Sequence, residues 1–282
     1  MFFRHRSTQG EYFDLPDRPA AETAAAFRDL DRLNRLFAFT KPFVEVLPPW
    51  LGARRCARLE VLDLGAGTGS LGQQLGAWAG GRGWQWRFTN LDANPLAFGT
   101  PHAPRAVVGS ALALPLATES FDVVVASQMT HHLADGQLVE HLREAWRVTR
   151  DALMICDLHR NPGLYALLWL STRLLRLSRH VRADALISVQ RGFRLGEWRD
   201  LAQQAGLEGV KVWLYCGSRI VLQARKRAAA GATTATNASY RLGAESCSPG
   251  AGRSPAPAQT RPDPQPRASG GAAPTRSRNG PP

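Results

Sequence analysis

The sequence predicts an α/β protein with a doubly wound, mostly parallel sheet of seven strands that ends in an antiparallel hairpin. From residue 59 onward, short apolar runs alternate with amphipathic segments, as in a parallel sheet covered by helices on both faces. A glycine-rich turn separates the first of these runs from the first amphipathic segment. The last two apolar runs are only three residues apart, which is too short for a helical crossover, so we expect them to pair antiparallel.

The individual elements follow from two periodicities. Helices are expected where apolar residues recur at spacings of three and four, and strands where short runs rich in aliphatic and aromatic residues are bounded by turn residues. Three prolines, Pro42, Pro48 and Pro49, predict a linker between the first helix and the sheet. The expected strands are 59–64, 86–92, 105–108, 121–126, 152–157, 210–215 and 219–224, and the expected helices are 20–39, 70–79, 135–148, 164–179 and 195–205.

Composition divides the chain into three parts. Residues 1–50 are expected to form a helical arm or cap, and 51–225 the main domain with a helical insert at about 161–192. Residues 226–282 are rich in Ala, Gly, Pro, Ser, Thr and Arg, which predicts a disordered tail. This tail has eight basic and two acidic residues, so it carries +6 of the net charge of +12. The charge is therefore weak evidence for nucleic-acid binding, and we expect no nucleic-acid partner.

Cysteine spacing indicates whether the chain binds a metal, and the hydropathy of its segments indicates its cellular compartment. None of the four cysteines forms a CxxC pair, and no Cys/His cluster has zinc spacing, so no metal is expected. The N-terminus lacks the apolar core of a signal peptide, and a reducing cytoplasm is the expected compartment. The apolar stretch 164–175 includes Arg173 and is too short to span a bilayer. The insert 164–182 is nevertheless a candidate lid, or a point of peripheral membrane contact. The oligomeric state is left open.

The glycine-rich turn carries the main chemical signal. Strand 59–64 runs into Gly65-Ala66-Gly67-Thr68-Gly69, and a helix opens directly afterwards. Glycines allow close approach of the backbone to a ligand, and the helix N-terminus presents unpaired N–H groups. Asp63, two residues before the first glycine, can hold an ammonium group.

The segment Asp63-Leu64-Gly65-Ala66-Gly67-Thr68-Gly69 resembles the cofactor loop of class I S-adenosylmethionine-dependent methyltransferases, which have a Rossmann-like fold. The resemblance covers about residues 55–225 and implies S-adenosyl-L-methionine as cofactor. It implies that the methionine part is contacted by Asp63, Gly65, Ala66, Gly67 and Gly69, and the ribose by Asp92 at the end of the second strand. It also implies that the adenine is contacted by Ser110 and Ala111, and that Ser127 and Gln128 lie near the methyl group. Ser110 stands where the family usually has an acid, which weakens the adenine assignment.

Candidate catalytic and substrate residues follow the fourth and fifth strands. Ligands of open α/β sheets bind beyond the carboxyl ends of the strands. His131 and His132 lie there, and an imidazole titrates near neutrality, so either is a candidate general base. Asp157 and His159 follow the fifth strand and are candidate substrate contacts. The competing interpretation is that these residues only cap and pack.

The His-His-Leu run and Asp157-Leu158-His159-Arg160 resemble small-molecule methyltransferases of the quinone-biosynthesis and polyketide-associated types. The resemblance implies O- or C-methylation of a lipophilic phenolic, quinone or polyketide-like acceptor in small-molecule biosynthesis. Two other classes stay open. Gly67 to Gly72 also satisfies GxGxxG with Asp92 at a suitable distance, which allows an NAD-dependent oxidoreductase. A non-catalytic Rossmann-like binding protein, or an RNA methyltransferase, is the other alternative.

Overall fold

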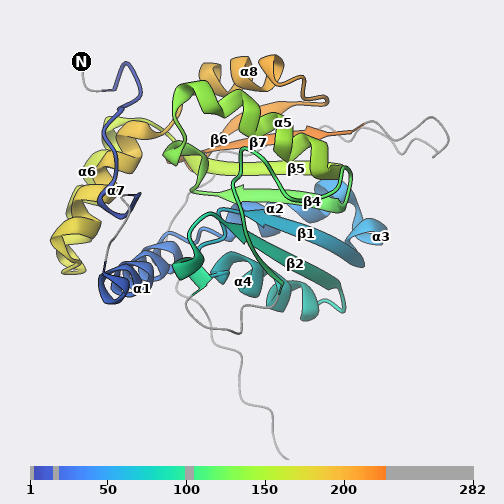
Figure 1. The fold of residues 1–282 in the computed structure, drawn as a ribbon, viewed down its shortest axis with the longest axis horizontal. Coiled ribbons are helices and arrows are strands. Elements are labelled where there is room, and N and C mark those ends of the chain that lie inside the picture. The colour runs from blue at the N-terminus through green and yellow to red at the C-terminus, as the bar shows by residue number, and fades with distance from the viewer. Residues whose placement is uncertain (1–2, 15–18, 99–104, 227–282) are drawn as a thin grey trace, which may run out of the picture. The chain divides into compact units, whose positions relative to one another are not determined.

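A computed structural model describes residues 3–14, 19–98 and 105–226. Its centre is a seven-stranded sheet in the order β3-β2-β1-β4-β5-β7-β6 (Figure 1). All neighbouring strands are parallel except β7, which is antiparallel to β5 and β6. The predicted fold, including the terminal hairpin, is confirmed. The strands are β1 Arg58–Leu64, β2 Gln85–Asp92, β3 Ala106–Val108, β4 Phe121–Ser127, β5 Thr149–Leu158, β6 Lys211–Tyr215 and β7 Arg219–Arg225.

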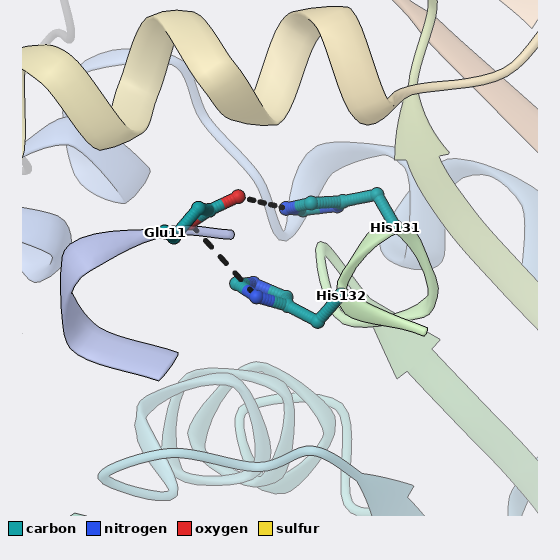
Figure 2. A group of neighbouring side chains, drawn as sticks. All are labelled: Glu11, His131 and His132. Atoms are coloured by element: carbon teal, nitrogen blue, oxygen red, sulfur yellow. Dashed lines mark ion pairs between the residues drawn. The ribbon is translucent and has the colours of Figure 1, made fainter. Parts of the chain in front are cut away.

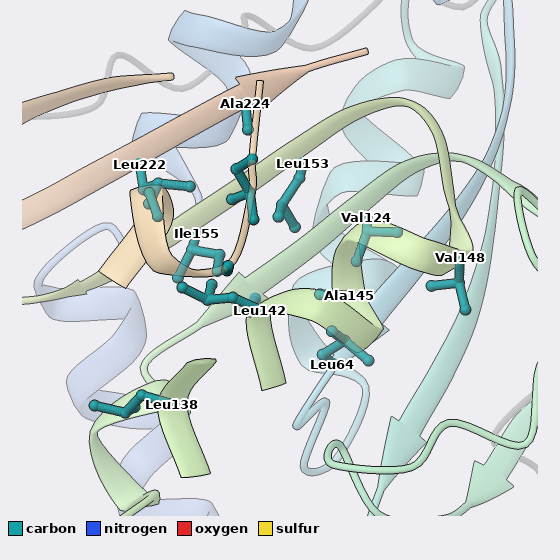
Figure 3. Packing of buried hydrophobic residues seen from close by; sticks show 14 of the residues in the cluster. Leu64, Val124, Leu138, Leu142, Ala145, Val148, Leu153, Ile155, Leu222 and Ala224 are labelled. Carbon is teal, nitrogen blue, oxygen red and sulfur yellow. The ribbon is translucent and has the colours of Figure 1, made fainter. Parts of the chain in front are cut away.

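Helices cover both faces of this sheet. On one face α5 (Leu138–Val148) and α8 (Leu195–Gln204) pack against alternate strand residues such as Val124 and Leu153 (Figure 3). On the other face α2 (Lys41–Leu51) and α4 (Ser70–Gly80) pack against the intervening residues, including Val123. Because both faces of β4 are buried, its residues 123–126 are a continuous apolar run, as expected for a central parallel strand.

The predicted linker after the first helix is wrong, because residues 41–51 form helix α2. Pro42 lies in the first helical turn, where its missing N–H has no intrahelical role. Pro48 and Pro49 lie in the last turn and each lack one backbone donor. Burial of Phe43 and Leu47 against the sheet offsets that loss. A short helix, α3 (Ala53–Cys56), then leads into β1.

The insert contains two helices rather than the single predicted one, α6 (Pro162–Leu174) and α7 (Arg179–Arg191). Arg176 has a left-handed backbone (φ +52°), and the Ser178 side chain accepts from the Val181 N–H to begin α7. Helix α1 (Ala20–Leu36) packs on this pair, with Leu33 against Leu177 (Figure 1). No helix within the described ranges is long and apolar enough to cross a membrane.

Short 3-10 turns complete the main domain and the arm. They are η1 Tyr12–Asp14 in the arm, η2 Pro95–Phe98 after β2, and η3 Thr130–His132 and η4 Asp135–Gln137 between β4 and α5. The predicted tail, 227–282, lies outside the described residues. The boundaries of the arm, main domain and insert remain a proposal.

Candidate functional site

The glycine-rich turn joins β1 to α4 at the carboxyl edge of the sheet. Gly65, Gly67 and Gly69 all have positive φ angles, of 64°, 54° and 75°. The Gly67 N–H donates to Oδ2 of Asp92 at 2.9 Å, and this bond ties the turn to the end of β2. Two predicted cofactor residues, one in the turn and one at the end of β2, are therefore in direct contact.

Asp63 lies at the end of β1, directly before this turn, and is buried. Burial and the nearby charge of Asp92 raise the pKa of Asp63 to about 8, so its carboxyl is mainly protonated at neutral pH. Its Oδ2 has no hydrogen-bond partner among the described residues. A buried carboxyl without a partner is costly, and a ligand ammonium group would complete it.

The predicted adenine segment follows β3. The Gly109 N–H donates to the Asp92 carbonyl at 3.0 Å. The Ser110 hydroxyl, which is exposed, accepts from the Leu112 N–H at 3.1 Å, so it stabilises its own turn. Ala111 accepts from Nδ1 of the buried His141 at 3.2 Å. Burial lowers the pKa of His141 to about 4, so a neutral imidazole holds this segment against α5.

Apolar side chains lie over the glycine-rich turn. A Cβ added to Gly65 would lie 2.0 Å from Cγ of Met129, and one added to Gly67 would lie 3.7 Å from the Phe27 ring. Met129 comes from the segment after β4, and Phe27 comes from α1. The N-terminal helix is thus a wall of the candidate cofactor site, whereas composition alone had predicted only an arm or cap.

Ser127 and Gln128 end β4 beside this wall. The Gln128 N–H donates to the Cys156 carbonyl at 3.0 Å, and its backbone is left-handed, with φ +56°. The side-chain Nε2 of Gln128 is buried and has no partner within the described ranges. A strained residue with an unpaired amide at the end of a central strand is typical of a ligand site.

The next turn brings His131 onto Asp157 at the end of β5. Nδ1 of His131 lies 2.6 Å from Oδ1 of Asp157, and the His131 N–H donates to Oδ2 at 3.1 Å. A carboxylate only accepts, so Nδ1 carries the proton and Nε2 is the remaining basic atom. Burial raises the pKa of Asp157, but the charge and hydrogen bond of His131 outweigh it, and the net direction is downward.

Asp157, predicted to contact substrate, lies in the interior of the protein at the end of β5, and its contact with substrate stays a prediction. Its side chain is fully buried, and both oxygens accept from His131 or from the Leu158 N–H. Asp157 therefore positions His131. Nδ1 of His159 lies 3.1 Å from the Gly217 carbonyl in the β6–β7 turn, and its contact with substrate also stays a prediction.

The N-terminal arm covers both histidines. Figure 2 shows Glu11 beside them, with Oε1 3.7 Å from Nε2 of His131 and Oε2 3.9 Å from Nδ1 of His132. Nδ1 of His132 also lies 2.8 Å from Oδ1 of Asp14. Burial lowers the pKa of His132, but Glu11 and Asp14 outweigh it and raise this pKa to about 9. His132 is therefore mainly a cation at neutral pH.

Two arginines hold the same turn in place. Arg191, at the end of α7, donates from Nε to the His131 carbonyl at 2.9 Å and from Nη1 to Asp14 at 3.1 Å. It also donates to the His132 carbonyl. Arg6 of the arm donates to the His131 carbonyl at 3.1 Å and lies over the Phe193 ring. Arm, insert and sheet thus meet at the two histidines.

Glu11, His131 and His132 are also a group with metal-like spacing, since their candidate ligand atoms all lie within 4.8 Å of one another. Each histidine already shares its Nδ1 with a carboxylate, at 2.6 Å for His131 and 2.8 Å for His132. These bonds account for the cluster as a hydrogen-bonded network of imidazole and carboxylate groups.

Sequence reasoning missed the arm and insert residues of this network. Glu11, Asp14 and Arg191 lie more than 50 residues from the histidines in the chain. No local motif marks them. Arg191 ends a stretch, 179–191, that has weak amphipathic character because Asp184 and Arg191 are buried together with its apolar residues.

Residues 61–152 match the family model described as a methyltransferase domain. No curated protein sequence matches the chain. Three solved structures share the fold, each at 15–17% identity. An S-adenosylmethionine-dependent methyltransferase of Aquifex aeolicus has a TM-score of 0.51 at 15% identity, covering 74% of this chain and 99% of the other.

The other two are described as an S-adenosylmethionine-dependent methyltransferase of Methanococcus maripaludis and an O-methyltransferase of Nostoc punctiforme. Both have TM-scores of 0.50, and both matches cover 77% of this chain. The Methanococcus maripaludis protein is 15% identical and is covered over 98% of its length, and the Nostoc punctiforme protein is 17% identical and is covered over 64%. The domain match agrees with the cofactor loop at Asp63 to Gly69. Residues 61–152 therefore belong to a methyltransferase domain, and the chain has the seven-stranded fold of the three solved structures.

Proposed function

We propose that the chain is an S-adenosylmethionine-dependent methyltransferase that methylates a small, lipophilic acceptor with an acidic hydroxyl or carbon acid, of phenolic, quinone or polyketide-like type. The observation that carries the proposal is the His131–Asp157 pair, 2.6 Å apart, which directly follows the Met129 wall of the cofactor loop. A base at that place can remove the proton of an acceptor as it attacks a methyl group in line.

The cofactor residues have distinct roles in this proposal. Asp63 holds the ammonium group, the backbone of Gly65, Ala66, Gly67 and Gly69 leaves room for the methionine part, and Asp92 accepts from the ribose. The backbone around Ser110 and Ala111 borders the adenine. Ser127 and Gln128 border the reacting end, where the unpaired Gln128 amide is available to a ligand. The cofactor, when bound, supplies a methyl group on a positively charged sulfur.

His131 is the proposed general base. Asp157 keeps its proton on Nδ1, so Nε2 is the atom that accepts the proton of the acceptor. Oε1 of Glu11 lies 3.7 Å from this Nε2, so a carboxylate borders the atom that accepts the proton. His132, mainly protonated, adds positive charge that stabilises the developing phenolate or enolate.

The walls support a lipophilic acceptor. Met129 and Phe27 lie over the glycine turn, and α6 and α7 contribute a buried cluster that includes Leu164, Leu168 and Val189. A cytoplasmic location is part of the proposal, and of the described cysteines two are buried thiols. We propose no nucleic-acid partner.

The cofactor assignment is tested first by thermal unfolding with S-adenosylhomocysteine or with NAD. A ligand at about 100 times its dissociation constant adds about 2.7 kcal/mol of stability. We expect a rise in Tm with S-adenosylhomocysteine alone, and loss of that rise in the Asp92→Ala variant. A rise with NAD alone would contradict the methyltransferase activity.

The acceptor and base are tested with labelled S-adenosylmethionine against phenols, hydroquinones and resorcinols of graded lipophilicity. His131→Gln should lower turnover by about 10²- to 10⁴-fold while keeping the S-adenosylhomocysteine shift. The exposed His5→Gln provides a matched control that keeps full activity. If His131→Gln retains activity on every acceptor that the native protein accepts, His131 is not the base.

A further inference from the structure

Helix α6 has apolar side chains on its outer face as well as its inner face. Leu164, Leu168 and Thr172 are buried on the inner side. Leu167, Leu170 and Leu174 recur at spacings of three and four on the outer side, with 47%, 50% and 73% of their surface exposed. A helix that is apolar around its circumference is normally buried, so this outer stripe calls for a partner surface.

The charge around the stripe is of one sign. Residues 162–183 contain no Asp or Glu and four arginines, at 173, 176, 179 and 182. None of these arginines forms an ion pair with a described residue. The Arg173 guanidinium lies 3.9 Å from the centre of the Trp169 ring, which is also exposed. The surface thus combines leucine, tryptophan and uncompensated positive charge.

The combination of apolar side chains and positive charge favours an anionic membrane over a second copy of the chain as the partner surface. In a twofold contact between two copies, the arginines of one copy would face those of the other with no acid between them, which is unfavourable. A membrane that contains anionic lipids accepts both features, because leucine and tryptophan enter the boundary of the acyl chains while arginine pairs with headgroups.

We propose that α6, with the turn to α7, docks on an anionic membrane surface, where the enzyme collects its acceptor. The docking surface consists of Leu167, Trp169, Leu170, Leu174 and the arginines at 173, 176 and 179. The inner side of α6 packs in the same cluster as Val189, two residues before Arg191, which holds the His131 turn. The membrane as the source of a lipophilic acceptor rests on the proposed function; the docking itself does not.

The test is co-sedimentation of the full chain with vesicles of phosphatidylcholine alone and with roughly one third phosphatidylglycerol, without cofactor or acceptor. We expect binding to the anionic vesicles that weakens with salt, and little binding to neutral ones. The variant Leu167→Ser/Leu170→Ser/Leu174→Ser should bind at least tenfold more weakly. Arg173→Gln/Arg176→Gln/Arg179→Gln should lose about a hundredfold, since each basic residue near such a surface contributes roughly fivefold.

Matched controls carry the same changes elsewhere. Leu214→Ser on β6 and Arg199→Gln on α8 alter exposed residues away from α6 and should bind as the native chain does. Each variant must unfold cooperatively near the Tm of the native chain; if the triple leucine variant does not, Leu174→Ser, the most exposed position, replaces it. No vesicle binding by the native chain overturns the proposal. Equal binding by native chain and α6 variants also overturns it, since another basic segment then binds. Because the assay contains no acceptor, a failure of membrane docking can be told apart from a failure of the proposed methyl transfer.

Discussion

Nδ1 of His131 lies 2.6 Å from Oδ1 of Asp157, joining the ends of β4 and β5 at the carboxyl edge of the sheet. The variant Asp157→Asn should lower kcat by about 10²- to 10⁴-fold, because an amide can donate to Nδ1 and favour the tautomer that protonates Nε2. The pH profile of kcat/KM separates positioning from a structural role. We expect the acidic limb of this profile to move to lower pH while S-adenosylhomocysteine affinity is kept. Loss of activity with an unchanged profile and a lower Tm would indicate packing alone.

Asp63 gives a second prediction, on proton release. With a pKa of about 8 in the free protein, its carboxyl is mainly protonated at pH 7, and a bound ammonium group favours the ionised form. S-adenosylhomocysteine binding should therefore release close to one proton below pH 8. Affinity should rise by up to about tenfold per pH unit until that pH and then level off. Calorimetry in buffers of different ionisation enthalpy measures the release.

The matched variant for this experiment is Asp63→Asn, which keeps the shape and removes the titration. It should bind with no proton release and with a flat dependence on pH. Native affinity that does not change between pH 6 and pH 8 would show that the bound ligand leaves Asp63 in its free protonation state.

The sheet and cofactor loop could be predicted from the sequence because their signals are local. Strand β4 is a continuous buried run, and Asp63 to Gly69 form one uninterrupted motif. Helix α2 could not be predicted, because the proline penalty is visible in the sequence while burial of Phe43 and Leu47 against the sheet is not. Propensity is overridden here by tertiary packing.

The histidines illustrate the same limit in the site. Their place after β4 was predictable from the strand pattern. Their partners were not, because Glu11 and Asp14 come from the arm and Arg191 from the end of the insert. Contacts between segments more than 100 residues apart, such as Asp14 and His132, leave no periodicity in the sequence.

His132 predicts a pH dependence of stability. Its pKa is raised from the usual 6.5 to about 9 by Glu11 and Asp14. A group whose pKa is raised in the folded state stabilises that state fully below its unfolded pKa and loses the effect as pH rises through the folded pKa. Tm should therefore fall between about pH 6.5 and pH 9, and His132→Gln should have a smaller fall than the exposed His5→Gln. Equal slopes in the two variants would exclude His132 as the source.

The cluster at Glu11 also predicts the effect of chelators. A histidine must lose its proton to ligate a metal, and the raised pKa of His132 opposes that loss. The 2.8 Å contact to Asp14 already satisfies its Nδ1. Activity and Tm should be unchanged after dialysis against a strong chelator. A loss of activity that added zinc or manganese restores would assign these three residues to a metal centre instead.

Gly65 combines two constraints that an alanine cannot meet. Its φ is +64°, and an added Cβ would lie 2.0 Å from Cγ of Met129. The left-handed backbone alone costs about 1–2 kcal/mol for a residue with a Cβ. Gly65→Ala should therefore lower Tm and abolish the S-adenosylhomocysteine shift. Met129→Ala in the same chain removes the 2.0 Å contact to Cγ but keeps the Met129 Cβ at 2.6 Å and the backbone strain, so it should recover only part of the Tm.

Gly80 provides the control for that experiment. It lies in α4, has no positive φ, and an added Cβ would have no neighbour within 4 Å. Gly80→Ala should leave ligand binding intact and stabilise the protein by about 0.5–1 kcal/mol, because glycine is the weaker helix former. If Gly65→Ala behaves like Gly80→Ala, the turn accepts a Cβ despite its positive φ and the contact with Met129, and the cofactor site must lie elsewhere. If only Gly65→Ala loses ligand binding, the ligand must lie close to the backbone of Gly65, as the cofactor assignment expects.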